Sequence, residues 1–293
     1  MNMEDLFIFR TVAKHGSITK AAEKFNFVQS SVTAKIKRLE AYFQTQLFYR
    51  HRYGVALTPS GKILLDYVEK ITYLFQQAEN DLLYSKKLKG PLAIGSMETT
   101  AAVRLPKPLA TFARNYPDVE LSLKTGPTDE LIRLVHNHEL DGAFVAGPIC
   151  HRGLVYEEIF REELVLVGKS EWFHDENYGE LADRPLLVFK QGCSYRKKLE
   201  EWLQSQKIVP TKRLEFGSLE AIIGCVNAGL GVSLLPKSVI TRFQSSDSFE
   251  WRPIYDGWVT TYWIRRQDVM PSMAMTKFLE IVKTSDGDAS FVV

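Results

Sequence analysis

Residues 29–40 read QSSVTAKIKRLE, and this stretch decides the first part of the fold. Its apolar residues Val32, Ile36 and Leu39 recur at i, i+4 and i+7, which places them on one face of an α-helix. Hydroxyl, amide and basic side chains occupy the other faces. The stretch therefore predicts an amphipathic helix from about residue 29 to 42, with one side buried and a polar side presented outward.

The residues on either side of this helix complete a small domain. Residues 6–13 place apolar side chains on one face of an earlier helix, Gly16 ends that helix, and Ser17 can cap a second one. Two helices joined by a short turn form the helix-turn-helix pattern. Residues 47–58, LFYRHRYGVALT, place apolar and basic residues around a glycine, as a two-stranded wing requires.

Charged residues are distributed unevenly along the 293-residue chain, whose net charge is +2. Residues 1–62 contain ten Lys or Arg and four Asp or Glu, whereas the remainder contains 27 basic and 31 acidic residues. A basic N-terminal unit on a mildly acidic body predicts nucleic-acid binding at that end. Taken alone, the charge fits a solvated surface equally well.

A long helix is predicted between Pro59, which can occupy a first helical turn, and Gly90. Six apolar residues recur within it at alternating spacings of four and three, a heptad seam typical of a helix that pairs with another helix. These predicted dimerisation residues are Leu64, Val68, Ile71, Phe75, Ala78 and Leu82. The alternative is a long helix that packs on its own domain.

From Pro91 onward, short apolar strands alternate with helical segments. Strands are expected at 92–95, 119–123, 142–146, 164–168, 186–189, 213–216, 232–235 and 259–264. Helices are expected near 103–115, 128–138, 195–206, 218–228, 236–243 and 272–283. This alternation predicts an α/β fold with largely parallel sheets, arranged as one domain or as two lobes with a cleft between them.

Several other classes of protein are disfavoured. No apolar run approaches the ~18 residues of a membrane helix, the acidic start shows no secretory signal, and three cysteines cannot close a disulfide framework. The dinucleotide, phosphate-loop and G-x-S-x-G signatures of enzymes do not occur, and the histidines and cysteines lack a standard zinc spacing. We therefore expect a cytoplasmic protein that is not an enzyme, with no metal, no cofactor and no membrane partner.

Together these patterns resemble the LysR-type transcriptional regulators. The resemblance rests on residues 7–13 FIFRTVA, 16–22 GSITKAA, 29–40, 47–50 LFYR and 57–61 LTPSG, with their order and spacing intact. It continues more weakly in 139–143 ELDGA and 228–236 AGLGVSLLP, so that it covers nearly the whole chain.

The resemblance implies a winged helix-turn-helix at residues 1–58, a dimerisation helix at 59–89, and an α/β two-lobed effector domain at 90–293 like the periplasmic binding proteins. It places lobe I at about 91–162 and 266–293 and lobe II at about 163–265. Such regulators are typically homotetramers, built as dimers of dimers on double-stranded promoter DNA. A small-molecule effector that binds between the lobes changes how the tetramer binds DNA. RNA polymerase is a further candidate partner.

Polar residues of the helix at 29–42 are the foremost candidates for DNA contacts. Gln29 can bridge N6 and N7 of adenine, and Ser30, Ser31 and Thr33 can contact bases or phosphates. Basic side chains, and hydroxyls at helix starts, suit phosphates, which position a protein without specifying sequence. Candidates of this kind are Ser17, Thr19, Lys35, Lys37, Arg50 and Arg52. Ser17 also fits a plain helix cap, and the wing also fits a solvated turn.

Hydroxyl residues between strand ends and helix starts are the candidate effector ligands. In open α/β sheets, ligands lie at the carboxyl ends of strands, and free N–H groups at a helix start suit a carboxylate. The candidates are Ser96, Thr99, Thr100, Thr128 and Ser218, with Arg196 as a cation from the second lobe. Plain helix capping is the alternative for the hydroxyl residues. This set predicts a small anionic metabolite as the effector.

A rival interpretation from another class is a cytoplasmic small-molecule-binding protein or enzyme with an incidental helical N-terminus. It predicts neither DNA affinity nor a heptad seam, and the seam is present in the sequence. Redox sensing at Cys193 is disfavoured, because a sensor cysteine usually has a resolving thiol nearby and Cys225 is far along the chain.

Overall fold

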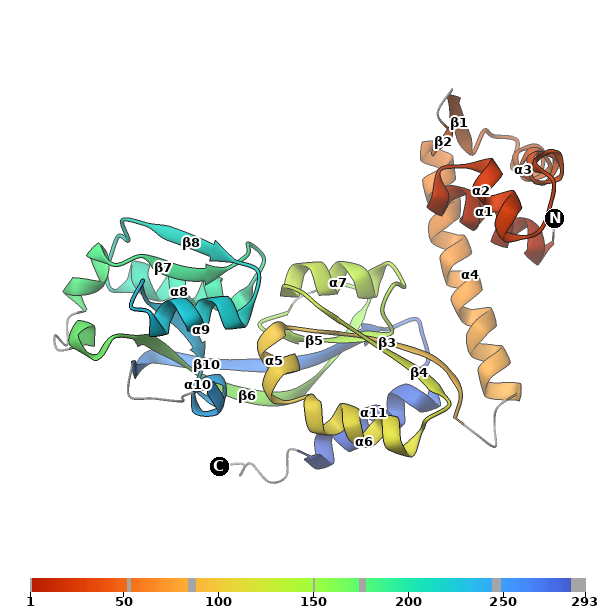
Figure 1. Ribbon diagram of the computed structural model, residues 1–293. Helices are drawn as coiled ribbons and strands as arrows, with labels where there is room; N and C mark the ends of the chain where they lie inside the picture. The colour runs from red at the N-terminus through yellow and green to blue at the C-terminus, as the bar shows by residue number, and fades with distance from the viewer. Residues whose placement is uncertain are drawn as a thin grey trace. The chain divides into compact units, whose positions relative to one another are not determined.

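The computed structural model describes residues 2–51, 54–83, 88–149, 151–173, 178–243 and 249–285. The chain divides into two compact units, residues 1–83 and 84–293. Figure 1 shows the helices and strands of each unit.

The first unit is a winged helix-turn-helix followed by a long helix, as predicted. Its elements are α1 (Met3–His15), α2 (Ile18–Lys24), α3 (Gln29–Phe43), β1 (Phe48–His51), β2 (Gly54–Leu57) and α4 (Pro59–Leu83). Val32, Ile36 and Leu39 of α3 are all fully buried in one core with α1 and α2. The polar side of α3 is thereby turned outward.

The wing is anchored to the turn between α1 and α2. Gly16 ends α1 at φ +59°, in the left-handed region that favours glycine. Its carbonyl accepts a hydrogen bond from the Val55 amide of β2 at 2.9 Å. A Cβ on Gly54 would lie 2.3 Å from that same carbonyl oxygen, so the strand approaches this closely because residue 54 is glycine.

Only some of the apolar residues predicted to form the dimer seam of α4 are exposed. Val68 is 0% exposed and packs in the core of its own unit, where Leu64 is partly buried as well. The side chains left exposed are Ile63, Tyr67, Ile71, Leu74 and Phe75. The assignment of Leu64 and Val68 to a dimer interface is therefore wrong, because the helix-turn-helix core already covers them. Ala78 is exposed, and the side chain of Leu82 lies outside the described residues.

The predicted extent of this helix is also too long. Helix α4 ends at Leu83, whereas the predicted helix continues to residue 89. Residues 84–87 lie outside the described part of the chain, and Leu88 and Lys89 are not helical. Four exposed apolar side chains of α4, which we call the exposed stripe, are Ile63, Tyr67, Ile71 and Leu74. These residues follow one another at spacings of four, four and three, so they share one helix face.

The second unit is an α/β domain with two lobes. Its strands are β3 (Gly90–Ser96), β4 (Val119–Thr125), β5 (Gly142–Ala146), β6 (Leu154–Gly168), β7 (Leu186–Phe189), β8 (Arg213–Phe216), β9 (Ser233–Pro236) and β10 (Glu250–Arg266). Its α-helices are α5 (Glu98–Val103), α6 (Pro106–Asn115), α7 (Thr128–His136), α8 (Ser194–Ser205), α9 (Leu219–Asn227), α10 (Lys237–Phe243) and α11 (Met273–Ser285). Two short 3-10 helices, Ser170–Phe173 and Gly179–Asp183, precede β7.

A six-stranded sheet of order β4-β3-β5-β10-β6-β9 joins the lobes, and β7 and β8 form a separate parallel pair. Strand β3 pairs in parallel with β4 and β5, whereas β10 and β6 pair antiparallel with each other, as do β10 with β5 and β6 with β9. The expectation of largely parallel sheets is therefore wrong for the large sheet. Strands β6 and β10 are long and pass from one lobe to the other (Figure 1).

The chain returns from lobe II to lobe I before residue 266, which is where the sequence predicted this boundary. Residues 261–265 of β10 pair with β5 of lobe I, and a break in register separates Pro253 from Trp258. Residues 258–266 therefore belong to lobe I, and β10 crosses between the lobes near residues 254–257. The predicted helix at 103–115 corresponds to α6, and the preceding helix α5 (Glu98–Val103) was not predicted. Pro106 has no amide hydrogen to continue α5, and it begins α6 instead.

Asp5 of α1 is a buried carboxylate on which the first unit depends. It is 0% exposed, accepts hydrogen bonds from Arg38 of α3 and from the Asn2 amide, and lies 3.6 Å from Lys35 Nζ. Burial raises the pKa of this carboxyl, but the hydrogen bonds from Arg38 and Asn2 outweigh burial and hold its pKa below the ordinary value of 3.8.

We predict that Asp5→Asn destabilises the first unit by about 1–3 kcal/mol at neutral pH, because Arg38 then loses its buried charged partner. In the wild type the folded pKa lies below the unfolded one, so this stabilisation is present above about 3.8 and is lost as the pH falls through the folded value. Urea unfolding across acidic pH should show that loss in the wild type and not in Asp5→Asn. The control Asp66→Asn, at an exposed position of α4, should keep the wild-type profile.

We predict opposite effects for two neighbouring substitutions on α4. Tyr67 is 59% exposed on the exposed stripe, so Tyr67→Asp should leave the unit folded but dissociate a dimer that pairs through this stripe, because it buries an unpaired charge there. Val68→Asp should unfold the unit. Light scattering and circular dichroism separate the two effects. A folded Tyr67→Asp protein that keeps the wild-type mass would show that the stripe does not pair.

Candidate functional site

The polar side of α3 forms the candidate DNA-binding surface. Gln29, Ser30 and Lys37 are exposed, and Ser31 and Thr33 are partly exposed. Val28 stands at the N-cap position and supplies no side-chain hydrogen bond to the first turn of α3. The Ser31 amide donates to the Val28 carbonyl at 3.0 Å, so the amides of Gln29 and Ser30 are the ones that remain available to an acceptor such as a phosphate oxygen.

Lys35 does not belong to this surface. Its Nζ atom lies 2.5 Å from Glu4 Oε2, and its side chain is 18% exposed. Lys35 also lies over the ring of Phe27, at 5.5 Å from the ring centroid. The prediction that Lys35 contacts phosphate is wrong, because acidic residues of α1 already pair with its charge. Lys37, on the opposite side of α3, remains free of such pairing among the described residues.

The remaining DNA candidates lie around α3. Ser17 accepts a hydrogen bond from the Lys20 amide at 3.3 Å, so it caps α2, and Thr19 is exposed in the first turn. Arg50 is exposed on β1 of the wing. Arg52 lies outside the described residues. Ser17 is thus occupied by its capping role, whereas Thr19 and Arg50 are accessible to a ligand.

A cavity of about 740 Å³ separates the two lobes of the second unit. It lies where β4, β7 and β8 end and α5, α7 and α8 begin. Thr99 and Thr128, two of the predicted effector residues, line this cavity. The other lining residues include Met97, Glu98, Thr125, Pro127, Asp129, Glu130, Arg133, Phe189, Lys190, Gln191, Cys193, Tyr195 and Phe216.

Hydroxyl groups from both lobes meet in the wall of this cavity. The Thr99 hydroxyl donates to the Tyr195 hydroxyl across 3.2 Å, which links α5 to α8. The Ser194 hydroxyl lies 3.2 Å from Thr128 Oγ1 and 3.1 Å from the Ala146 carbonyl oxygen. These contacts join lobe I to lobe II at the cavity itself, so a ligand that binds here competes with them or adds to them.

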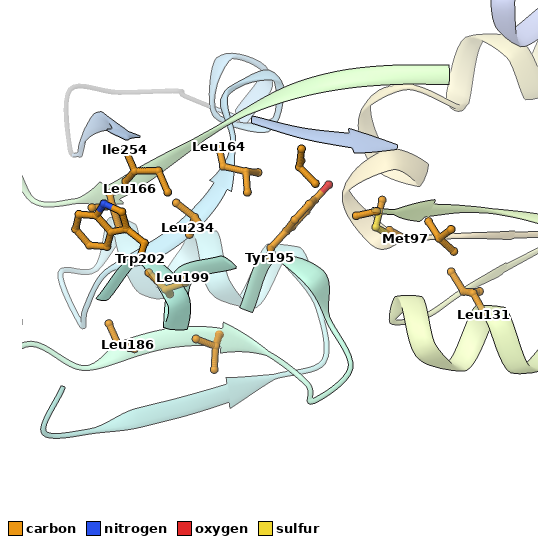
Figure 2. Packing of buried hydrophobic residues seen from close by; sticks show 14 of the residues in the cluster. Met97, Leu131, Leu164, Leu166, Leu186, Tyr195, Leu199, Trp202, Leu234 and Ile254 are labelled. Carbon is orange, nitrogen blue, oxygen red and sulfur yellow. The ribbon is translucent and has the colours of Figure 1, made fainter. Parts of the chain in front are cut away.

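Tyr195 lies at the contact between the lobes, in the cavity wall. Its ring packs in one apolar cluster with Met97 and Leu131 of lobe I and with Leu164 and Leu199 of lobe II (Figure 2). Burial raises the pKa of its phenol well above the ordinary value of 10.0. The phenol therefore stays protonated and acts as a hydrogen-bonding group at this point.

Helix α5 is linked to lobe II by two carboxylates, directly through Glu98 and indirectly through Glu162. Glu98 Oε2 accepts a hydrogen bond from the Leu219 amide at the start of α9, at 3.0 Å. At the other end of α5, Arg104 Nε donates to Glu162 Oε1 at 2.7 Å, and Ser238 of α10 donates to Glu162 Oε2 at 2.8 Å. The short helix α5 is thus bonded to α8 and α9, and through Glu162 of β6 it is linked to α10.

Four predicted effector residues do not line this cavity. The Ser96 hydroxyl is buried and bonds to the Met97 carbonyl, and Thr100 is buried on α5. Ser218 caps α9 through the Ala221 amide. Arg196 lines a smaller adjoining cavity of about 410 Å³ and is paired there with Glu200 and Glu215. The structure therefore does not bring these four side chains into the cavity with Thr99 and Thr128.

Sequence reasoning missed Tyr195, Glu98 and Glu162. Glu162 offered a signal, because a charged residue beside the apolar strand 164–167 needs a partner if it is buried. Tyr195 and Glu98 offered none, since their partners are 96 and 121 residues away in the chain. Cys193 lines the cavity, but burial raises the pKa of its thiol, which disfavours the reactive thiolate.

The described residues contain neither a membrane-spanning helix nor a cluster of metal-ligating side chains. No helix within those ranges is both long and apolar enough to cross a membrane. No group of three His, Cys, Asp or Glu among the same residues is arranged to hold a metal ion.

Comparisons with known families match both units. Residues 3–62 match the model of the bacterial regulatory helix-turn-helix protein, lysR family, and residues 85–286 match the LysR substrate binding domain. The chain is 47% identical over 281 residues to the HTH-type transcriptional regulator GltR of Bacillus subtilis, covering 95% of each protein. It is 39% identical to the HTH-type transcriptional regulator CzcR of the same organism, covering 96% of this chain and 97% of CzcR.

Solved structures share the fold. A full-length variant of OxyR from Pseudomonas aeruginosa aligns with a TM-score of 0.72 at 24% identity, over 97% of this chain and 94% of that chain. CbnR complexed with its target DNA aligns with a TM-score of 0.68 at 21% identity, over 97% of this chain and all of that chain. The relatives are transcriptional regulators and not enzymes, which removes the rival interpretation of an enzyme with an incidental helical N-terminus. This chain belongs to the LysR family of DNA-binding transcriptional regulators.

Proposed function

We propose that the cavity between the lobes binds a small metabolite that carries a carboxylate, and that its binding changes how the regulator holds promoter DNA. The observation that carries this proposal is the cavity of about 740 Å³ whose walls come from both lobes. A ligand that touches both walls favours one lobe arrangement over another, and such differential affinity is what shifts a conformational equilibrium.

Helix starts at the cavity support a carboxylate as the recognised group. Helices α7 and α8 begin at Thr128 and Ser194, and neither of their N-cap residues, Pro127 and Cys193, forms a side-chain cap hydrogen bond. Free amides at a helix start carry partial positive charge and suit an anionic acceptor. Lys190, also in the cavity wall, adds a full positive charge.

Structural relatives support effector binding by this fold. LysG from Corynebacterium glutamicum, solved with bound effector Arg, aligns with a TM-score of 0.70. We propose that this chain likewise responds to its effector without a further cofactor. It would act in the cytoplasm, as a dimer of dimers on promoter DNA, in which the exposed stripe of α4 pairs two copies.

We predict that Thr33→Ala costs roughly 1–3 kcal/mol at one base pair of the operator, provided that Thr33 contacts a base in the major groove. Operators selected from random DNA by the wild-type protein supply the test sequences. Binding of wild type and variant to single-base operator variants then locates the contact. Equal loss on operator and random DNA would place Thr33 on a phosphate instead.

The lysines of α3 supply the matched control for that experiment. Lys37→Ala should reduce the salt dependence of DNA binding by about one released counterion, because Lys37 is exposed on the same helix as Thr33. Lys35→Ala should leave the salt dependence unchanged, because Lys35 is paired with Glu4.

We predict that Thr128→Val weakens effector binding roughly tenfold, because the cavity loses a hydroxyl at the start of α7. Thr100→Val, a buried substitution outside the cavity, should bind as the wild type does. A panel of small carboxylic acids, screened with the full-length protein by thermal shift and then by calorimetry, supplies the ligand. Equal affinities in Thr128→Val and wild type would contradict the assignment of this wall.

A further inference from the structure

The two walls of the cavity carry opposite charge. Lobe I contributes Glu98, Asp129, Glu130 and Arg133, so its wall is net acidic. Lobe II contributes Lys190 and no acidic residue. A ligand that bridges the walls therefore meets negative charge on one side and positive charge on the other.

Asp129 is the acid that faces the opposite lobe. It is exposed in the first turn of α7, and a Cβ on Gly192 of lobe II would lie 3.2 Å from its Oδ2 atom. Its carboxylate thus lies against the loop that follows β7. Within the part of the chain that the structure describes, no cation or hydrogen-bond donor pairs with it.

The other acids of this wall are already engaged. Glu98 accepts the Leu219 amide, and Glu130 lies 3.4 Å from Lys124 Nζ. Lys190, which follows β7, has no acidic partner among the described residues, so the walls do not neutralise each other. The cavity therefore holds one unpaired carboxylate and at least one unpaired ammonium on opposing walls.

We propose that the effector is zwitterionic, an amino-acid-like molecule with an ammonium bound by Asp129 and a carboxylate bound by Lys190 and the free helix-start amides. This inference rests on the proposed carboxylate site and adds the second charge. A purely anionic ligand would satisfy Lys190 but would bring a second negative charge near Asp129, with which neither Lys190 nor Arg133 is paired among the described residues. A ligand that satisfies both charges touches both lobes, which is the condition for shifting the lobe arrangement.

The test uses the full-length protein and three matched sets of probes. These are the common L-amino acids, their 2-hydroxy acids, which lack the ammonium, and the corresponding primary amines, which lack the carboxylate. We expect at least one amino acid to raise the melting temperature, and both of its truncated analogues to bind roughly tenfold more weakly or worse.

Substitutions in the wall identify the two charges. Asp129→Asn should weaken binding of the amino acid roughly tenfold and should not weaken binding of the 2-hydroxy acid, because it removes a negative charge that repels an anion. Lys190→Gln should weaken both. Glu130→Gln is the matched control on the same helix and in the same cavity, and it should retain wild-type affinity because its carboxylate is already paired with Lys124.

The outcomes separate this inference from the proposed function. If 2-hydroxy acids bind as tightly as amino acids, or carboxylic acids bind while amino acids do not, the zwitterion is refuted and the carboxylate site stands. If amines bind without any carboxylate requirement, both proposals fail. An absence of any shift with the amino-acid panel also overturns the inference.

Discussion

The antiparallel pairing of β6 with β10 is the interaction on which the effector unit depends. Residues 154–163 of β6 pair with 258–266 of β10 in lobe I, and residues 165–168 pair with 250–253 in lobe II. Because both strands are continuous through the two lobes, the lobes can rotate about this ladder but cannot separate. The cavity is built from loops and helix starts carried on either side of it, so its width is set by the angle between the lobes.

Buried charge at this ladder couples the lobes. Glu162 is 6% exposed on β6, beside the crossing, and a carboxylate buried there without partners would cost several kcal/mol. Arg104 of lobe I and Ser238 of lobe II satisfy its two oxygens. The same helix α5 that presents Arg104 begins with Glu98 and Thr99 in the cavity wall. A ligand that displaces the start of α5 therefore acts on a helix whose other end is held at the crossing.

The same physical rule governs the first unit. Asp5 is buried, so its charge must be satisfied, and the groups that satisfy it are Arg38 and Lys35 of α3. This pairing holds α3 against α1 at a defined orientation and presents Gln29, Ser30 and Thr33 outward. As a consequence, Lys35 in the middle of α3 stabilises the fold, and the polar side that carries Gln29, Ser30 and Thr33 stays accessible.

The sequence by itself determined the winged helix-turn-helix, because helix periodicity, a glycine stop at Gly16 and the strand–turn–strand pattern are local and each residue's neighbours lie within one or two turns. It also predicted hydroxyl residues at a crevice between strand ends and helix starts, and two of the five predicted, Thr99 and Thr128, line the cavity. The tertiary structure decided everything that needs a distant partner. Packing against the helix-turn-helix decides that Val68 is buried while Tyr67 is exposed. Strand pairing decides that β6 and β10 run antiparallel, and the contact between the lobes brings Tyr195 to Thr99. The sequence could not determine these features, because burial and pairing depend on residues far away in the chain.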